Sequence, residues 1–272
     1  MILNISHVTT YTYSGSVRSA VQSLRLTPSR FDGQRTVRWQ ISIEGGQKGG
    51  TFRDGAGDWI EGWSLRGPLT GVTVRAEGTV ETTDLAGVLR GHREHVPPAA
   101  YLRDTEATRA SAALEALSAE AAQQGQNGGA LGLAHTLSGL VADRIAYRPG
   151  TTTAHTTAAK ALEQGEGVCQ DHAHALISVA RLRGLPARYV SGYLFADASG
   201  RPHEAAHAWA EVWVEGLGWV GFDPANRCCP DDRYVRLGSG YDAQDAAPIR
   251  GLAIGAAAEN LTVEVAVGAA QQ

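Results

Sequence analysis

The sequence is poor in the features that mark several classes of protein. It has only three cysteines among 272 residues, two of them adjacent (Cys228 and Cys229), too few for a disulfide framework. No apolar run approaches the roughly 18 residues needed to cross a bilayer. The first residues, "MILNISHVTTYTYS", lack the basic leader and apolar core of a signal peptide. We therefore expect a cytoplasmic protein with free thiols.

An excess of positive charge is also missing. Lys and Arg number 24 against 28 Asp and Glu, which gives a net charge of −4 and a pI near 6.1. This balance offers no attraction for nucleic acid or an anionic membrane surface, so we expect neither as a partner. Apolar residues make up 43% of the chain and charged residues 19%, as in soluble globular proteins. The length suits one large domain or two ordinary ones.

The first third of the chain has the alternation typical of β-strands. Five segments alternate apolar and polar residues and are separated by Gly, Pro or Asp: "ISHVTTYTYS", "AVQSLRLTP", "RTVRWQISIEG", "DWIEGWSLRG" and "GVTVRAEGTVETT". Glycines between 45 and 50 fit a hairpin connection, because no strand-to-helix context marks them as a phosphate loop. We predict an antiparallel, sandwich-like sheet and a β-rich domain of residues 1–95.

After Pro97 and Pro98 the composition changes to the helix-favouring Ala, Leu and Glu. Helices are predicted within 93–124 and over 133–147, 157–165 and 168–183. Strands are predicted to follow at 187–195, 207–216, 218–224, 234–240 and 261–267. Helices followed by an antiparallel sheet indicate a second domain, residues 96–272, and an α+β fold class for the chain.

Cys169 begins the helix predicted at "GEGVCQDHAHALISVARLRG". Its apolar residues recur at helical spacing, and Gly184 and Pro186 end it. In the first turn, unpaired N–H groups and the helix dipole favour a thiolate, and the Cys169 amide is the natural first donor to an oxyanion. We expect the two preceding glycines to leave the sulfur exposed. The alternative is a small buried hydrophobe at the start of a helix.

His207 and Asp223 are the candidate partners of that cysteine. His207 opens the predicted strand "HAWAEVWVEG", and Asp223 ends the next one, "GWVGFDP". If paired residue numbers sum to 432, Asp223 lies opposite Trp209 and within reach of His207. This register requires an odd-length turn or a bulge, because a one-residue slip would put them on opposite faces. Cys169 would then attack a carbonyl, His207 would carry the proton, and Asp223 would orient the imidazole. Taken singly, a strand-end histidine and an Asp-Pro turn are the alternatives.

Other histidines and cysteines receive no catalytic role. We expect His172 and His174, on the same helix as Cys169, at the helix surface or around the site, and His203 in a polar turn. A zinc site of Cys169, His172 and His174 is disfavoured, because side chains three and five residues along a helix point in different directions. We predict no metal and no cofactor, and we assign no role to the pair of adjacent cysteines.

Three blocks of the sequence resemble the bacterial transglutaminase-like superfamily, whose core is similar to papain-like cysteine proteases: "YRPGTTT", "GEGVCQDHAHALISVARLRGLPARYVSGYL" and "HAWAEVWVEGLGWVGFDPANR". The first ninety or so residues resemble the β-rich N-terminal region of bacterial members, and "DDRYVRLGSGYDAQDAAPIRG" resembles the segment after their catalytic Asp. The resemblance implies Cys169 as nucleophile, His207 as base and Asp223 as orienting acid. His172 stands where many relatives carry a bulky aromatic, a difference that concerns the shape of the pocket.

The same triad serves more than one reaction at a carbonyl. We expect hydrolysis of a peptide or protein amide bond through a thioester, because transfer to an amine requires protection from water. Transamidation of glutamine side chains and a non-catalytic peptide-binding module stay open as alternatives. Gln164 and Tyr147 have the chemistry of a second oxyanion donor, but neither is assigned. Three tryptophans of the hairpin either line a cleft or belong to the core: Trp209, Trp213 and Trp219.

Overall fold

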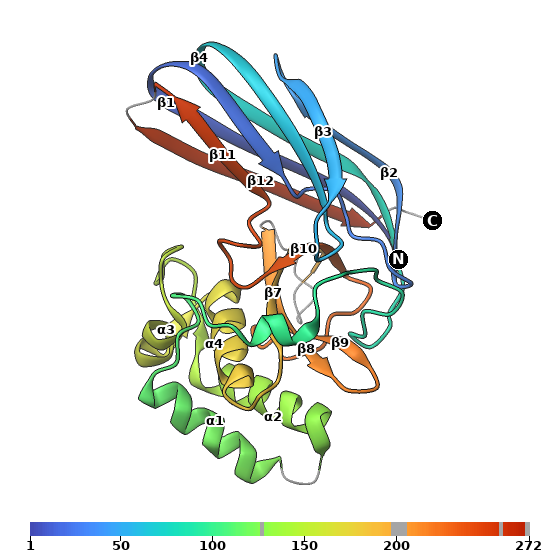
Figure 1. Cartoon of the computed structure of the whole chain (residues 1–272), viewed down its shortest axis with the longest axis vertical. Coiled ribbons are helices and arrows are strands. Elements are labelled where there is room, and N and C mark those ends of the chain that lie inside the picture. Colours follow the sequence, from blue (N-terminus) through green and yellow to red (C-terminus); the bar gives the residue numbers. More distant parts are fainter. Residues whose placement is uncertain (126–127, 197–205, 256–257, 270–272) are drawn as a thin grey trace.

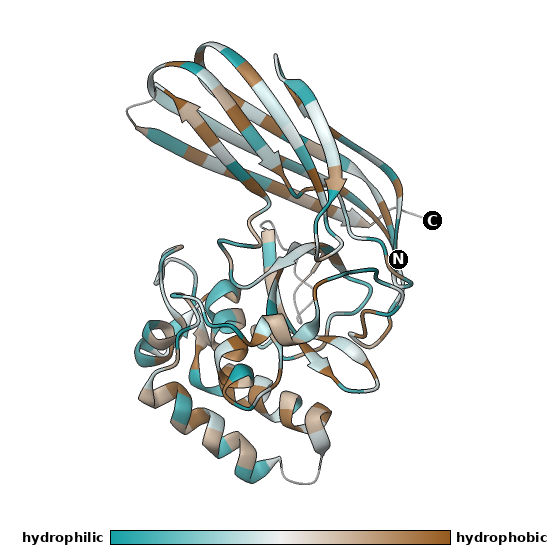
Figure 2. Ribbon diagram, in the orientation of Figure 1, coloured by the Kyte–Doolittle hydropathy of each residue, from teal (hydrophilic) through white to brown (hydrophobic). Residues whose placement is uncertain are grey.

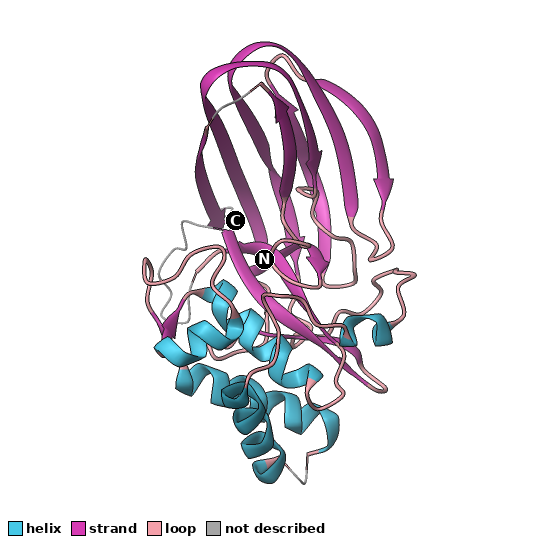
Figure 3. Cartoon of the chain, turned by 60° about the vertical axis from the view of Figure 1, so that its left-hand side comes forward, coloured by secondary structure: helices cyan, strands magenta, loops and turns pink. Residues whose placement is uncertain are grey.

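The computed structural model describes residues 1–125, 128–196, 206–255 and 258–269, so His203 lies outside the described residues. A large antiparallel sheet forms one end of the molecule, and helices packed around a smaller antiparallel sheet form the other (Figures 1 and 3). The fold is α+β, as predicted. The helices gather on the side of the small sheet that faces away from the large one.

The large sheet is built on two long strands that pair with each other along most of their length, β1 (Ile2–Leu24) and β4 (Trp59–Thr82). Each joins two segments predicted as separate strands. β2 (Gln34–Ile43) and β3 (Gln47–Arg53) pair with the two halves of β4. Because β3 begins at Gln47, the predicted glycine connection narrows to a turn at Gly45 and Gly46.

Alternation along β1 and β4 creates the core of this part. Buried and exposed residues alternate from Leu3 and Ile5 onward, which appears as brown and teal bands along the strands (Figure 2). The buried face also receives Tyr193, Val235 and Leu237 from the smaller sheet. The two sheets therefore share one hydrophobic cluster.

The last strands of the chain return to the large sheet. β11 (Ile249–Ile254) and β12 (Glu259–Ala269) both pair antiparallel with β1, as the red and dark blue ribbons show (Figure 1). The second of these strands was predicted, but the first was not, because "IRGLAI" is short, carries a glycine and does not alternate strictly. The predicted range 96–272 included both strands with the helical part. In the structure, both strands pair with β1 on the side opposite β4. The division into two domains stays a prediction.

The other part holds the predicted helices in their predicted order. They are a short 3₁₀ turn at Pro98–Leu102, α1 (Ala112–Gln124), α2 (Gly129–Arg144), α3 (Ala158–Gln164) and α4 (Cys169–Arg181). Almost every residue of α4 is buried, with the other helices on one side and β7 and β8 on the other. Among the described residues, no helix combines the length and apolar character needed to span a membrane.

The small sheet has the strand order β10-β7-β8-β9. Its strands are β7 (Ala187–Leu194), β8 (Ala206–Val214), β9 (Gly218–Phe222) and β10 (Tyr234–Gly240), and all neighbours are antiparallel. Two short strands, β5 (Ala146–Tyr147) and β6 (Glu166–Gly167), pair in parallel immediately before α4. The last residue of β6 is therefore two positions from Cys169.

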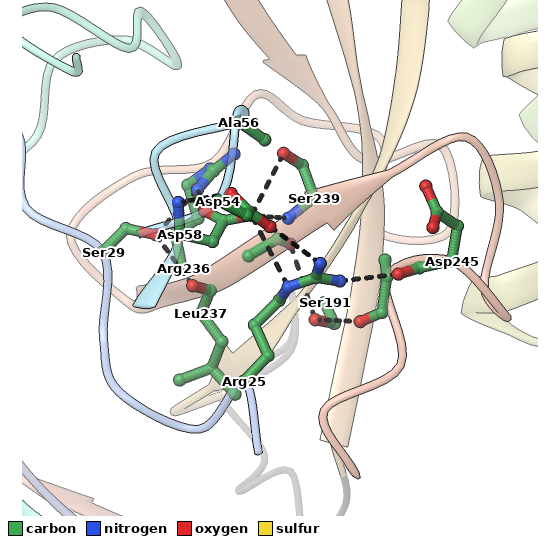
Figure 4. A network of polar contacts seen from close by, with 12 residues as sticks. Arg25, Ser29, Asp54, Ala56, Asp58, Ser191, Arg236, Leu237, Ser239 and Asp245 are labelled. Carbon is green, nitrogen blue, oxygen red and sulfur yellow. Dashed lines mark hydrogen bonds and ion pairs between the residues drawn. The ribbon is translucent and has the colours of Figure 1, made fainter. Parts of the chain in front are cut away.

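A buried polar network also joins the two parts (Figure 4). Asp58, which precedes β4, accepts from Arg236 of β10 at 2.9 Å and from the Ser239 amide at 2.7 Å. Arg25, just after β1, donates to Asp54 at 2.9 Å and to the Asp245 carbonyl at 2.6 Å. These bonds fix the loops of the large sheet against the edge of the small one. No feature of the sequence indicated them.

Candidate active site

The segment before Cys169 places this residue in the first turn of α4, as predicted. α3 ends at Gly165, which adopts a left-handed conformation with φ of 69°, and β6 follows directly. The Asp171 carboxylate then accepts from the Val168 amide at 2.8 Å, so it caps the start of the helix. The amides of Cys169 and Gln170 have no carbonyl one turn upstream in the helix to bond.

The two glycines have a different purpose from the predicted one. Gly165 supplies the positive φ that ends α3. A Cβ on Gly167 would lie 2.7 Å from the Cβ of Asp171, so this position must be glycine for the capping carboxylate to fold back. The glycines therefore shape the backbone that leads into Cys169, and exposure of the sulfur is not what requires them.

The hairpin of β8 and β9 has the predicted register. Ala210 pairs with Phe222, Val212 with Val220 and Val214 with Gly218, so paired numbers sum to 432. The connecting turn holds the three residues 215–217, the odd length that this register requires. Asp223 follows directly after β9 and lies on the same face as His207.

The structure brings the three predicted residues together. His207 Nε2 lies 2.7 Å from Asp223 Oδ2, and both side chains are almost completely buried. Cys169 is half-buried, and it is close enough to His207 to raise the pKa of the imidazole. Because Nε2 is engaged by Asp223, Nδ1 is the ring nitrogen that can exchange a proton with the thiol. The sulfur, the imidazole and the carboxylate come from α4, β8 and the residue that follows β9.

The charge on His207 depends on opposing influences. Burial, the largest of them, lowers the pKa of the imidazole, but the Asp223 charge, the hydrogen bond to it and the contact with Cys169 together raise the pKa to about 10. For Asp223, burial works to raise the pKa, and the His207 charge with bonds from His207, Asn226 and Tyr234 brings it below its ordinary value. At neutral pH the site therefore favours an imidazolium between a carboxylate and the sulfur.

Two families of known proteins match different parts of this chain. The bacterial transglutaminase-like N-terminal region matches residues 3–81, and the transglutaminase-like superfamily matches residues 116–224. An uncharacterized protein of Mycobacterium tuberculosis is 30% identical over 293 residues, which cover 97% of this chain and 90% of that protein. The chain belongs to the transglutaminase-like superfamily. The predicted resemblance is confirmed.

Two further similarities are more limited in what they show. A crystal structure from Cytophaga hutchinsonii, provisionally described as a cysteine protease, superposes with a TM-score of 0.73 at 20% identity, covering 100% of this chain and 92% of that one. At this identity the match shows a shared fold. A protein-glutamine gamma-glutamyltransferase of Pseudomonas aeruginosa is 34% identical over 71 residues, which are 24% of this chain and 11% of that enzyme.

Two residues that the sequence analysis missed hold Asp223 in the transglutaminase-like core. Asn226 donates from its side chain to Asp223 Oδ2 at 2.8 Å and from its amide to Oδ1 at 3.2 Å. Tyr234, on the neighbouring segment, donates to Oδ2 at 2.8 Å. The run "DPAN" is a turn sequence in which Asp commonly accepts from a later amide, so Asn226 had a detectable signal. Tyr234 had none, because its approach depends on how β10 packs.

The two helix histidines are not at the surface, contrary to one of the expectations for them. His172 and His174 are each 1% exposed. The His172 ring lies 2.9 Å from the Val168 carbonyl and 2.8 Å from the Ile145 carbonyl, while His174 Nε2 accepts from the Ala243 amide at 3.0 Å. Both rings thus bond backbone groups. Across the part of the chain that the structure describes, no cluster of three His, Cys, Asp or Glu has the arrangement of a metal site.

The remaining candidates differ in place. Trp209 and Trp219 are each 3% exposed and lie in the interior, where Trp209 also borders a small cavity, and Trp213 is partly exposed. Tyr147 pairs with Gly167 beside the entry to α4, and Gln164 is exposed at the end of α3. Neither residue is assigned a role in binding an oxyanion. Cys228, given no role from the sequence, lies with its sulfur 3.3 Å from the Tyr234 hydroxyl.

Proposed function

We propose that this protein is a thiol-dependent acyl-transfer enzyme that hydrolyses peptide or amide bonds of a peptide or protein substrate. Cys169 is the nucleophile, His207 the proton carrier and Asp223 the orienting acid. The observation that carries the proposal is the buried 2.7 Å contact between His207 Nε2 and Asp223, with Cys169 close enough to the same ring to raise the pKa of the imidazole. Such an arrangement of nucleophile, base and orienting group is the requirement for covalent catalysis by a thiol.

The first half-reaction forms a thioester. The Cys169 thiolate attacks the substrate carbonyl carbon, and the resulting oxyanion lies at the start of α4, where the first-turn amides and the helix dipole stabilise negative charge. His207 donates its Nδ1 proton to the leaving nitrogen as the carbon–nitrogen bond breaks. The amine departs, and the acyl group remains on sulfur.

The second half-reaction releases the acid. A water molecule attacks the thioester while neutral His207 accepts one of its protons at Nδ1. The carbon–sulfur bond breaks, the carboxylic acid product leaves, and the thiolate and imidazolium are restored. Asp223 stays ionised throughout and keeps Nε2 in place.

Transamidation is the second candidate. The similarity to the Pseudomonas aeruginosa gamma-glutamyltransferase favours it. In that reaction an amine would take the place of water in the second half-reaction. The chemistry on Cys169 is otherwise the same. The two reactions differ in the product, an acid or a substituted amide.

A mixed peptide library, with and without an added primary amine, tests both candidates. The acylated peptide of Cys169 should appear by mass spectrometry and should be missing in Cys169→Ala. Acid products in the presence of amine support hydrolysis, and amine-labelled products would replace it with transamidation.

A second experiment separates an enzyme from a peptide-binding module that retains the fold. Iodoacetamide at neutral pH should alkylate Cys169 first, and His207→Ala should slow this reaction strongly. The pKa values of the other two thiols are raised, that of Cys229 to about 11, chiefly by burial, so they are internal controls. Slow labelling of all three cysteines alike would favour the binding module.

A further inference from the structure

The Asp223 carboxylate is held by more than the histidine it faces. Its Oδ2 atom accepts from His207 at 2.7 Å, from Asn226 at 2.8 Å and from Tyr234 at 2.8 Å. Asn226 belongs to the same turn as Asp223, so its contact is local. Tyr234 belongs to β10, which is separated from β9 in the sheet by β8 and β7. Its contact therefore ties the carboxylate to the far edge of the sheet.

Tyr234 is itself fixed in place. It is 5% exposed, and its ring packs edge-on against Trp209 at 5.5 Å and lies 5.8 Å from the His207 ring. An ionised carboxylate has no hydrogen to donate, so the Tyr234 hydrogen points to Asp223. The Cys228 sulfur, 3.3 Å from the hydroxyl oxygen, must then be the donor in that contact. The result is a directed chain from the Cys228 thiol through the Tyr234 hydroxyl to the Asp223 carboxylate.

We propose that Tyr234 is a positioning residue of the triad: its hydroxyl fixes the rotation of the Asp223 carboxylate so that Oδ2 faces His207, and Cys228 orients that hydroxyl. The proposal rests on the proposed function of Cys169 and goes beyond it. The carboxylate of Asp223 can rotate about its Cβ–Cγ bond, and three hydrogen bonds to one oxygen restrict this rotation more than two would. His207 in turn takes its orientation from Asp223.

The charged surroundings make this proposal testable by titration. Four charged or titratable groups surround the hydrogen bonds that link Cys228, Tyr234 and Asp223. They are His207 from β8, Cys169 from α4, and Asp231 and Arg233 from the loop before β10. Asp231 and Arg233 pair with each other at 2.7 Å, and each has its charged form stabilised by this pairing. Burial raises the pKa of Tyr234, so its hydroxyl stays protonated. The test therefore follows Cys169 by its alkylation and His207 by its ring signal, each by a measurement specific to that residue.

The test compares Tyr234→Phe with Tyr193→Phe. Each change removes one buried hydroxyl and keeps the ring, but the Tyr193 hydroxyl bonds His7 at 2.7 Å in the core between the sheets. The rate of Cys169 alkylation by iodoacetamide is followed against pH by mass spectrometry. We expect the half-maximal pH to rise by about one unit in Tyr234→Phe, because a carboxylate that is no longer held toward His207 stabilises the imidazolium less, and the thiolate then loses part of the support of that positive charge. Tyr193→Phe should match the wild type.

A second measurement does not require a reactive thiol. The His207 ring signal, assigned by NMR from its loss in His207→Gln, should titrate about one unit lower in Tyr234→Phe than in the wild type. Cys228→Ala keeps Tyr234 and removes only the thiol that donates to its hydroxyl. It should therefore shift the alkylation profile and the His207 titration in the same directions as Tyr234→Phe, but by a smaller amount. If Tyr234→Phe does not fold, this variant tests the positioning role in its place.

The outcomes separate the two proposals. Superimposable profiles of wild type, Tyr234→Phe and Cys228→Ala in both measurements would overturn the positioning role and leave Tyr234 as a packing residue. An unreactive Cys169 in the wild type would instead remove the proposed function. The NMR comparison would then still decide whether Tyr234 positions His207.

Discussion

At the scale of single residues, the chemistry depends on where the proton between Cys169 and His207 resides. A buried imidazole by itself would lose its proton, since burial disfavours the charged form. Asp223 reverses this outcome by its charge and by a 2.7 Å hydrogen bond, and the contact with Cys169 adds to it. In the proposed mechanism, the acid that protonates the leaving amine is thus present before the substrate arrives.

This balance predicts the pH dependence of amide hydrolysis. The pKa of His207 is raised to about 10, so the imidazolium is present below that pH, and the rate should fall as pH rises through about 10. Asp223→Asn removes the charge that raises this pKa, so the falling limb of the pH profile should move to lower pH by more than one unit. The rate of hydrolysis should also fall by on the order of 10³-fold or more. Hydrolysis of library peptides measured from pH 5 to 11 checks both effects. A limb that does not move in Asp223→Asn would mean that another group donates the proton.

At the scale of elements, the start of α4 depends on a close approach between backbone and side chain. Asp171 is fully buried and bonds the Val168 amide at 2.8 Å and the Thr152 hydroxyl at 2.7 Å. Gly167 leaves the space in which this carboxylate turns back. The same contacts hold the strand before the helix and the first turn in one arrangement, so they position the Cys169 sulfur and the first-turn amides together.

A methyl group at this point should therefore affect both stability and reactivity. Gly167→Ala would bring a Cβ to 2.7 Å from the Asp171 side chain, and we expect a loss of about 1–3 kcal/mol together with slower alkylation of Cys169. Gly132→Ala is the matched control, because nothing lies within 4 Å of that added atom in α2. It should be neutral or stabilising by up to about 1 kcal/mol. Urea unfolding and iodoacetamide labelling measure the two effects, and equal behaviour of the two variants would contradict the prediction.

At the scale of the whole molecule, the large sheet and the helical part are joined by buried charges. Glu211 of β8, four residues after His207, accepts from Arg236 at 2.9 Å and from Arg188 at 2.6 Å. Arg236 also donates to Asp58, which precedes β4 of the large sheet (Figure 4). These pairs therefore form one network that ends at Glu211, on the strand that carries His207. Burial works to raise the pKa of Glu211, but the charges of the two arginines and their hydrogen bonds lower it to about 2. The pKa values of both arginines are raised, so they keep their charge.

Breaking this network should be costly, since removing one partner leaves a buried charge without compensation. We expect Asp58→Ala to lower the free energy of unfolding by about 3–5 kcal/mol. Asp143→Ala removes a surface partner of Arg227 whose side chain is 59% exposed, and it should cost less than about 1 kcal/mol. Urea denaturation of both variants gives the comparison. A small effect of Asp58→Ala would show that the hydrophobic cluster between the sheets suffices to join them.

The molecule should also lose stability in mild acid. Burial lowers the pKa of His7 and of His174 to about 4, so each ring is neutral when folded and binds a proton more readily when unfolded. The stabilisation is fully present above about pH 6.5 and is lost as pH falls toward 4, by up to about 3 kcal/mol for each ring. Unfolding measured between pH 7 and 4.5 should show this slope. His7→Asn should flatten it, and an unchanged slope would exclude His7 as a source.

The sequence by itself determined the order of the elements and the residues of the candidate site. Period-two alternation marked the strands of the large sheet, helical spacing marked α4, and His207 and Asp223 fell on two successive strands. These are local patterns, because each is set by the chain geometry of neighbouring residues. Cys169, His207 and Asp223 were therefore within reach of inference from sequence alone. The register that puts His207 and Asp223 on one face was only a condition until the structure showed the odd turn length.

Tertiary structure decided what depends on distant segments. Only the packing of β10 brings Tyr234 to Asp223, only the return of β11 and β12 completes the large sheet, and only the meeting of the two parts buries Asp58 beside Arg236. Even the glycines before Cys169 acquired their meaning from a side chain folded back on them. Such contacts join residues far apart in the chain or depend on side-chain direction, and no periodicity in the sequence records them.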